Sequence, residues 1–420
     1  MPPEAVPWVA DVGSDDDPFE EFNRAMGAGR IENPYPDFVE LRRNGGVMQA
    51  DIRRLMGLDD DAPVDAADMP DVFTVGSFEG LCAVLRDGRT FSSRGYVDVM
   101  GPVLGHTILM MDEPEHHAYR NVLKQVFSRK AMAHWETEIV APVIHAYIDE
   151  FAEDGRADLV RQLTLPFPMT VIADLLGLPR ADLTRFHRLG IELIGVSINW
   201  ERGLAASQKL RDYFAEILEE RRRSPADDVI SVLASAEHDG LRLTDEEIFS
   251  FLRLLLPAGA ETTYRSSSNL LVGLLDAPDQ LEAVRADRTL VPQAIEEGLR
   301  WEPPLLTIMR TVTRDIDLEG VHLPKDAVVV VNLGSANHDE SRWDDPERFD
   351  IFRPPQQHLA FAFGAHLCLG MHLARMETSV LLNAVLDRLP GIRLDPDADP
   401  PAITGMTFRA PAAVPVVFDT

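Results

Sequence analysis

The chain has 420 residues, 45% of them hydrophobic, which is ample for a large folded core. Its 69 aspartates and glutamates outnumber 40 lysines and arginines, and the net charge of −29 argues against nucleic acids and anionic membrane surfaces as partners. Because it shows neither a basic leader followed by an apolar run nor a spanning stretch of roughly 18 apolar residues, we expect a soluble, cytoplasmic protein that binds no membrane.

Two acidic stretches near the N-terminus are poor in aromatic residues. Residues 11–17 are predicted to be flexible, and residues 59–71 to form a surface loop. No internal repeat or Gly/Ser linker divides the rest of the chain. We therefore assign residues 1–20 to a flexible acidic terminus and residues 21–420 to a single domain.

Helical spacing of apolar residues dominates from about residue 113 to residue 299. Short β-like runs follow at residues 309–313 and 327–332, with Gly320 and Pro324 marking a turn between them. The predicted breaks in the helical region are Pro166, Pro168, Pro179 and residues 223–225. The fold is thus predicted to be mainly α with a minor β region.

One predicted helix is unusually long. It begins at Thr244, where Glu247 completes a capping box, and continues to about Leu275, a length of roughly 45–50 Å. Its middle, residues 257–263, combines a proline, small residues and threonines. Proline removes a backbone hydrogen bond and threonine can bond back to a carbonyl, so we expect the helix to be locally distorted here.

Cys368 lies in a glycine-bearing stretch, residues 361–370, that ends where a helix can begin. Leu369, Leu373, Met376 and Val380 recur on one face of that helix. Free N–H groups at a helix N-terminus favour a thiolate and lower its pKa. The other cysteine, Cys82, gives no disulfide framework, and this suits a reducing compartment.

This stretch resembles the haem-binding loop of the cytochrome P450 family, in which the cysteine is the fifth ligand of the haem iron. The resemblance implies haem b as cofactor, held between the long central helix and the helix after the cysteine. The residue after the phenylalanine is often glycine in the family and is Ala362 here. The matching loop residues are Phe361, Gly364, His366, Cys368 and Gly370.

The middle of the long helix also resembles a family motif, small-Gly-x-acid-Thr, here residues 258–262. In the family the acid and the hydroxyl relay protons to the place where dioxygen is reduced. The resemblance therefore implies that Glu261 and Thr262 are catalytic residues.

Two further sets of residues match the family. Residues 112–120 are similar to the start of a helix that offers cations to the haem propionates, although Glu113 stands where proline is common. Arginine suits this role because its fork can donate two hydrogen bonds to a carboxylate. The implied propionate partners are His116, Arg120, Arg310 and His366.

Glu297 and Arg300 lie three residues apart on one predicted helix face and can form an ion pair. They match the family's Glu-x-x-Arg, and residues 346–349 match the segment whose arginine, here Arg348, completes a structural triad. Removing one partner of such a buried group is strongly destabilising.

Together these motifs imply a monooxygenase that oxidises a small, mostly apolar molecule. No nucleotide-binding Gly-x-Gly-x-x-Gly is present, so a ferredoxin and its NAD(P)H-dependent reductase are expected to supply electrons. A basic patch formed by Lys124, Arg129 and Lys130 is a predicted docking surface. Two alternatives stay open: a peroxide-driven haem-thiolate peroxygenase and a non-catalytic haem-thiolate sensor.

The substrate pocket is implied by resemblance alone. It would be bordered by a loop at residues 96–107 and by residues 305–308 and 405–407. The individual candidates are Leu255, Ala258, Gly259, Leu306, Ile308 and Met406.

Overall fold

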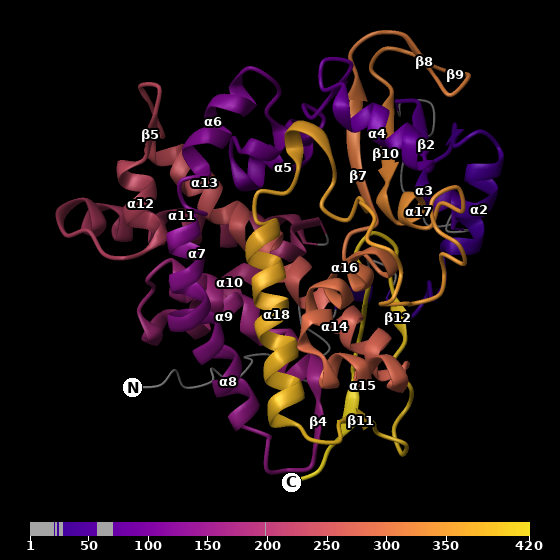
Figure 1. Ribbon diagram of the computed structural model, residues 1–420. Helices are drawn as coiled ribbons and strands as arrows, with labels where there is room; N and C mark the ends of the chain where they lie inside the picture. The colour runs from indigo at the N-terminus through magenta and orange to yellow at the C-terminus, as the bar shows by residue number, and fades with distance from the viewer. Residues whose placement is uncertain (1–20, 22, 25–27, 57–69, 198) are drawn as a thin grey trace.

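The computed structural model describes residues 21, 23–24, 28–56, 70–197 and 199–420. Helices dominate this part of the chain, and the largest sheet lies at one end of the molecule, beside α2, α4 and α17 (Figure 1). The predicted acidic terminus and nearly all of the predicted acidic loop lie outside the described residues.

The predicted mainly α fold with a minor β region is confirmed. The α-helices in chain order are α2 (Tyr35–Arg43), α3 (Ile52–Leu55), α4 (Phe78–Arg86), α5 (Tyr96–Leu104), α6 (Glu115–Leu123), α7 (Arg129–Trp135), α8 (Ala141–Asp149), α9 (Pro166–Leu175), α10 (Leu183–Ile194), α11 (Trp200–Arg223), α12 (Val229–Ser235), α13 (Asp245–Leu255), α14 (Thr262–Leu275), α15 (Pro278–Ala286), α16 (Val291–Trp301), α17 (Leu333–Asn337) and α18 (Met371–Arg388). Tighter or wider helical turns are η2 (Ile108–Met110), η3 (Glu136–Val140), η4 (Val160–Thr164), η5 (Arg180–Asp182), η6 (Gly195–Ser197), η7 (Leu256–Glu261), η8 (Arg288–Leu290) and η9 (Gly364–His366).

The predicted breaks at prolines are confirmed in part. Helix α9 begins at Pro166, and Pro179 precedes η5 as its N-cap. Pro168 lies inside the first turn of α9, where proline is tolerated, so the break predicted there is wrong. Helix α11 ends at Arg223 with Ser224 as its C-cap, at the predicted break.

The main sheet has five strands in the order β1-β2-β10-β7-β3, in which β2 and β10 are parallel and the other pairs antiparallel. Both predicted β-runs are confirmed as β7 and β10, which pair with each other, and a hairpin of β8 and β9 turns between them at Gly320. The strands are β1 (Val47–Met48), β2 (Val72–Val75), β3 (Phe91–Ser92), β4 (Arg156–Asp158), β5 (Glu237–His238), β6 (Leu241–Arg242), β7 (Thr307–Val312), β8 (Ile316–Leu318), β9 (Val321–Leu323), β10 (Val328–Asn332), β11 (Arg393–Leu394), β12 (Ile403–Thr404), β13 (Ala410–Pro411) and β14 (Pro415–Val417).

The predicted long helix is present as α13, η7 and α14 in direct succession. Its capping box is formed as expected: Thr244 N–H donates to Glu247 Oε2 at 2.7 Å, and Glu247 N–H donates to Thr244 Oγ1 at 3.4 Å. The predicted distortion is the wide π-helical turn η7, which includes Pro257.

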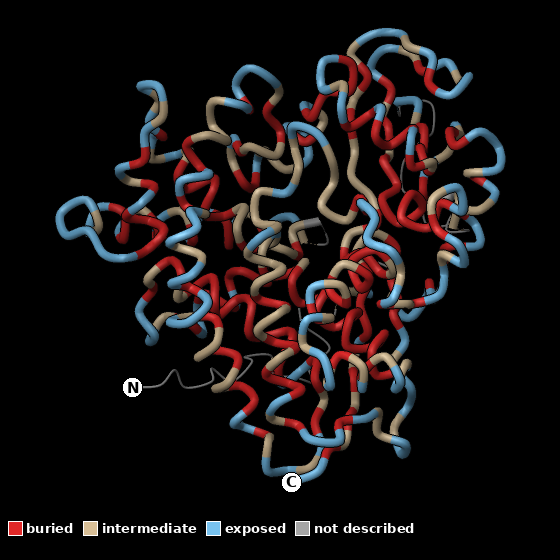
Figure 2. Tube along the Cα trace, in the orientation of Figure 1, coloured by how far each residue is buried: buried red, intermediate tan, exposed pale blue. Residues whose placement is uncertain are grey.

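The hydrophobic core has one large cluster among the helices and a smaller one between α4 and the five-stranded sheet. Buried segments line the interior along α14 and α16, while exposed residues follow the outer loops (Figure 2). None of the described helices combines the length and apolar character needed to span a bilayer. Helix α18 runs along this core, and its N-terminal end carries the cysteine loop (Figure 1).

Candidate functional site

Cys368 lies at the N-terminal end of α18, as predicted. Its N–H donates to the Phe361 carbonyl at 3.0 Å, which closes the loop, and the N–H groups of Gly370 and Met371 donate to its sulfur. The residue is exposed, so its sulfur is open to a ligand.

The expected lowering of the Cys368 pKa is wrong for the protein alone. Although the residue has accessible surface, the protein around it is dense enough that desolvation raises the pKa of its thiol. The N–H groups of Gly370 and Met371, together with Arg120 and Arg375, oppose that rise only in part. Coordination to a metal ion deprotonates a thiol outright, so the thiolate depends on the metal rather than on the helix terminus.

The loop before the cysteine uses left-handed backbone at two positions. Ala362 has φ +59° and Gly364 has φ +73°. A Cβ on Gly364 would collide with the backbone oxygen of Leu85. Left-handed backbone costs a non-glycine residue about 1–2 kcal/mol, which explains why glycine is common at the position of Ala362.

Replacing Ala362 by glycine is therefore expected to stabilise the protein by about 0.5–1 kcal/mol, the relieved strain less the backbone entropy that glycine loses. Gly364→Ala, the matched variant, should cost at least about 2 kcal/mol because it adds a collision to the strain. Urea unfolding of both proteins measures the difference. A destabilised Ala362→Gly variant would contradict this account of the loop.

Four basic side chains lie together beside the cysteine loop, as the resemblance implied: His116 and Arg120 on α6, Arg310 on β7 and His366 in η9. The rings of His116 and His366 are 4.0 Å apart between centroids. Burial, together with the charges of His116, Arg310 and Arg120, lowers the pKa of His366 to about 3. Burial also lowers the pKa of Arg120 and Arg310. Two buried guanidiniums, Arg120 and Arg310, thus lie beside two imidazoles that burial keeps neutral, and an anionic ligand would compensate the charge of the two arginines.

The Nε2 atom of His116 is evidence for an anionic ligand at this cluster. His116 is 2% exposed, and its Nε2 has no hydrogen-bond partner among the described residues, while its Nδ1 lies 3.3 Å from Glu113 Oε1. A buried polar atom left without a partner costs about 1–3 kcal/mol, which a carboxylate oxygen would recover. The cluster fits the two propionates of haem b.

The middle of the long helix keeps accessible surface although it runs through the interior. Ala258 is exposed, and Gly259 and Thr262 are half-buried. Thr262 Oγ1 donates to the Ala258 carbonyl at 2.6 Å, the back-bonding that the sequence predicted. The wide turn η7 therefore presents both a hydroxyl and a small-residue surface to this space.

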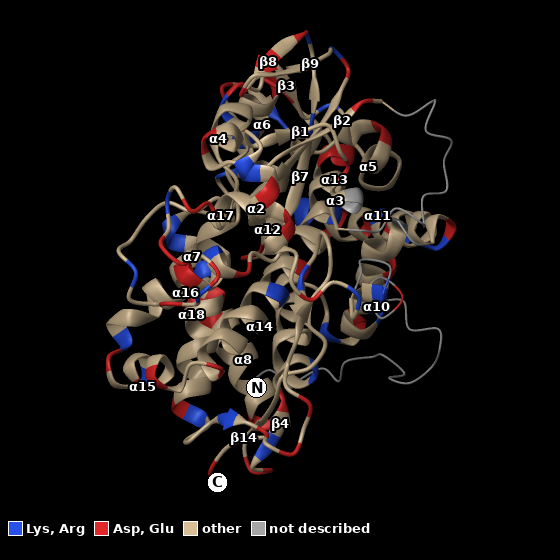
Figure 3. Ribbon diagram, turned by 90° about the vertical axis from the view of Figure 1, so that its right-hand side faces the viewer, with Lys and Arg blue, Asp and Glu red and all other residues tan. Residues whose placement is uncertain are grey.

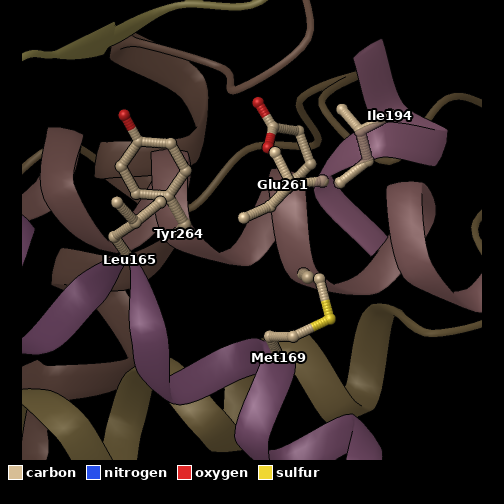
Figure 4. A pocket seen from close by; sticks show the side chains of 7 residues that line it. Leu165, Met169, Ile194, Glu261 and Tyr264 are labelled. Carbon is tan, nitrogen blue, oxygen red and sulfur yellow. The ribbon is translucent and has the colours of Figure 1, made fainter. Parts of the chain in front are cut away.

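Glu261 is buried, with 3% of its side chain exposed. Its Oε1 accepts two hydrogen bonds from Arg265, one of them from Nε at 2.6 Å, and Arg265 also donates to Asn23 Oδ1 at 2.7 Å. Beside Glu261 is a cavity of about 20 Å³, the size of one water molecule (Figure 4). It is lined by Leu165, Met169, Ile191, Ile194, Ala260, Glu261 and Tyr264.

A second buried acid joins the long helix to α18. Thr263, the neighbour of Thr262, donates through Oγ1 to Glu377 Oε2 at 3.3 Å. Burial raises the pKa of Glu377 to about 8, against a small opposing effect of this hydrogen bond. At neutral pH this carboxyl group is therefore protonated.

The predicted structural triad has a different third member. Arg300 makes the predicted two-pronged ion pair with Glu297, through Nε and Nη2 at 2.7 Å each. Arg348 does not reach Glu297: its side chain is 63% exposed and pairs with Asp350. Arg353, five residues on, is 12% exposed and places Nε 3.2 Å from Glu297 Oε1. The prediction for Arg348 is wrong because the loop turns its side chain outward, and only its backbone oxygen accepts from Arg300 and Arg353.

Replacing Arg353 by methionine is expected to cost about 3 kcal/mol of unfolding free energy, because it removes a partner of a buried carboxylate. Arg348→Met should change stability by less than about 0.5 kcal/mol, since its ion pair is exposed to solvent. Urea unfolding compares the two variants. Equal losses would contradict the assignment of Arg353.

The predicted substrate pocket is only partly compatible with the structure. Leu306 and Met406 are 0% and 7% exposed and belong to a small core with Tyr35 and Phe38 of α2, so they cannot line an open pocket. The predicted loop at residues 96–107 is largely the helix α5. The remaining candidates keep accessible surface: Leu255, Ala258, Gly259 and Ile308.

Sequence reasoning missed several charged residues of the site. Arg265 follows Glu261 by four residues on one helix, so the i,i+4 rule could have identified it. No local pattern identifies Arg353 or Glu377. The path of its loop brings Arg353 to Glu297, and the packing of the folded chain buries Glu377. The same holds for Glu296 on α16 and Arg375 on α18, whose side chains form an ion pair between the two helices.

Comparisons with known proteins identify the family that this chain resembles. Residues 193–406 match the family model described as Cytochrome P450. A steroid C26-monooxygenase of Mycolicibacterium smegmatis is 36% identical over 350 residues, covering 81% of this chain and 86% of that protein. The cytochrome P450 monooxygenase PikC of Streptomyces venezuelae is 32% identical over 405 residues, covering 93% and 89%. The crystal structure of CYP109E1 from Bacillus megaterium in complex with testosterone matches with a TM-score of 0.82 and 31% identity, covering 92% of this chain and 100% of that one.

Proposed function

The chain belongs to the cytochrome P450 family, and from this premise we propose how its residues serve the reaction, which substrates it takes and which partner reduces it. It is a haem-dependent monooxygenase that uses haem b to oxidise small organic molecules. When bound, the haem supplies dioxygen activation, which thiolate ligation favours.

We assign the iron ligand to Cys368 and the propionate partners to His116, Arg120, Arg310 and His366. The observation that carries this assignment is the buried, unpartnered Nε2 of His116, which lies with His366 and two arginines beside the exposed cysteine. Phe361, Gly364 and Gly370 shape the loop that presents the sulfur. The structural residues are Glu297, Arg300 and Arg353, whose buried ion pairs join α16 to the loop that carries Arg353.

We assign proton delivery to Glu261 and Thr262. The Thr262 hydroxyl is fixed by the Ala258 carbonyl and faces the accessible side of the helix. Both Arg265 contacts fall on Oε1 of Glu261, so Oε2 is the oxygen left to exchange protons with a water in the adjoining cavity. This acid–alcohol pair favours a monooxygenase over a peroxygenase or a sensor, neither of which needs it.

The test of this function is the absorption spectrum of the purified protein, reduced with dithionite and exposed to carbon monoxide. A strongly red-shifted Soret band with one haem per chain is expected. A protein that incorporates no haem, or one whose band lies where histidine-ligated haem absorbs, would overturn the assignment.

The substrate class that we propose is an apolar polycyclic molecule of steroid size. The pocket candidates that keep accessible surface are apolar or small, and α5, which contacts α13 in the fold, exposes Val97 and Val99. One relative is named for steroid oxidation, and one similar structure holds testosterone. Titration with testosterone should shift the haem spin state, whereas glucose should not; the reverse result would exclude this class.

A ferredoxin and its reductase are proposed as the electron source. Lys124, Arg129 and Lys130 are all exposed near the C-terminal end of α6 and the start of α7, as a docking patch requires. Changing all three to glutamate should slow reduction by ferredoxin at least tenfold at low salt, because like charges then meet. The matched control changes three other exposed basic residues to glutamate. These residues lie on α2 and α11 and are Arg43, Lys209 and Arg223.

Stopped-flow reduction measures both variants. Equal rates for the patch variant and the wild type would reject this docking surface.

The cytoplasm stays the proposed compartment, because both cysteines are free thiols and suit a reducing environment.

A further inference from the structure

Beside the cysteine loop, an ion pair joins α16 to α18. Arg375 on α18 donates to Glu296 on α16 through both prongs, Nε to Oε1 at 2.6 Å and Nη2 to Oε2 at 2.8 Å. Figure 3 shows acidic and basic segments adjoining at α16. Glu296 and Glu297 are neighbours on α16, but their carboxylates have different partners. Glu297 binds Arg300 of the structural triad, and Glu296 binds Arg375 on α18.

His358 fixes this carboxylate from the other side. Its ring is 5% exposed, and its Nε2 lies 3.1 Å from Glu296 Oε2. Its Nδ1 accepts the Ala360 N–H at 3.2 Å, so in the neutral ring the proton is on Nε2, which donates to Glu296. These hydrogen bonds outweigh desolvation and lower the pKa of Glu296 to about 2, so the carboxylate stays charged.

The paired arginine lies against the loop that presents the cysteine. Its guanidinium is 4.5 Å from the centre of the Phe361 ring, and the His358 ring is 6.0 Å from the same ring. Phe361 in turn accepts the Cys368 N–H. A cation so placed competes with the iron for the electron density of the thiolate.

We propose that Glu296, oriented by His358, is a positioning residue that compensates the charge of Arg375 and thereby sets how much electron density Cys368 gives to the haem iron. The inference rests on the proposed iron ligand. Neutralising either partner leaves the other charge uncompensated beside the loop. A cation stabilises the reduced, less positive haem, and an anion stabilises the oxidised form.

The test is the reduction potential of the haem-loaded protein in three variants. Glu296→Gln is expected to raise the potential, Arg375→Gln to lower it, and the double variant to return it close to the wild-type value. The Soret band of the carbon monoxide complex should move in opposite directions in the two single variants. Glu282→Gln, which breaks the ion pair of the exposed Glu282 with the half-buried Arg285 on α15, is the matched control and should leave both readouts unchanged.

Opposite signs distinguish this role from a structural one, since loosening of the loop would shift both single variants the same way. Shifts of the same sign, or no shift beyond that of the control, would overturn the proposal. If Glu296→Gln fails to bind haem, the reduction potentials of two variants of Arg375 test the proposal. Arg375→Gln should lower the potential, and Arg375→Lys, which restores the charge, should return it towards the wild-type value. The wild-type carbon monoxide spectrum tests the ligand assignment separately.

Discussion

Replacing Cys368 by serine is expected to abolish the red-shifted Soret band of the reduced, carbon monoxide-treated protein and to reduce monooxygenase turnover at least a thousandfold, a loss of about 4 kcal/mol of transition-state stabilisation. The physical reason is the donor atom: a serine hydroxyl ionises far less readily than a thiol and gives the iron little electron density. The fold should survive, because the side chain is exposed and a serine oxygen can accept the N–H groups of Gly370 and Met371.

The second cysteine provides the control. Cys82 lies on α4, in the core between that helix and the sheet, and is 6% exposed. Cys82→Ser should keep the red-shifted band and lose about 1–2 kcal/mol of stability through the buried hydroxyl. Spectra taken at equal haem content compare the two variants. A Cys368→Ser protein that retains the band would show that another residue binds the iron.

Local patterns in the sequence were sufficient for several parts of the site. The capping box at Thr244 and Glu247, the distorted turn before Thr262 and the ion pair of Glu297 with Arg300 each depend on residues within one or two turns of a helix. Their geometry follows from helix periodicity alone. The cysteine at the start of α18 belongs to the same group.

Features that depend on distant segments were not predictable in this way. Arg348 and Arg353 are both basic residues of one loop, and only the path of that loop decides which one reaches Glu297. Leu306 is enclosed because α2, more than 260 positions earlier, packs over it. The pKa of Cys368 was misjudged for the same reason: helix termini are visible in a sequence, but the amount of protein around the sulfur is not.

Glu377 is the other residue whose behaviour depends on tertiary burial, and its replacement by glutamine should have a large, pH-dependent effect. Its pKa is about 8 in the folded protein and 4.5 when freely solvated. Below pH 4.5 both states are protonated, and the carboxyl group costs no stability. Between pH 4.5 and 8 only the unfolded chain releases the proton, so the wild type loses stability as pH rises, and above pH 8 the loss is constant.

Glutamine has the same shape, can accept the hydrogen bond from Thr263 and does not ionise. Glu377→Gln is therefore expected to match the wild type near pH 4 and to exceed its unfolding free energy by on the order of 4 kcal/mol at pH 8. Urea unfolding at pH 4.5, 6 and 8 measures this difference, with the exposed Glu347→Gln as a control that should show no such trend. A stability difference that stays constant with pH would mean that Glu377 ionises normally in the folded protein, and that the link between α14 and α18 carries a charge at neutral pH.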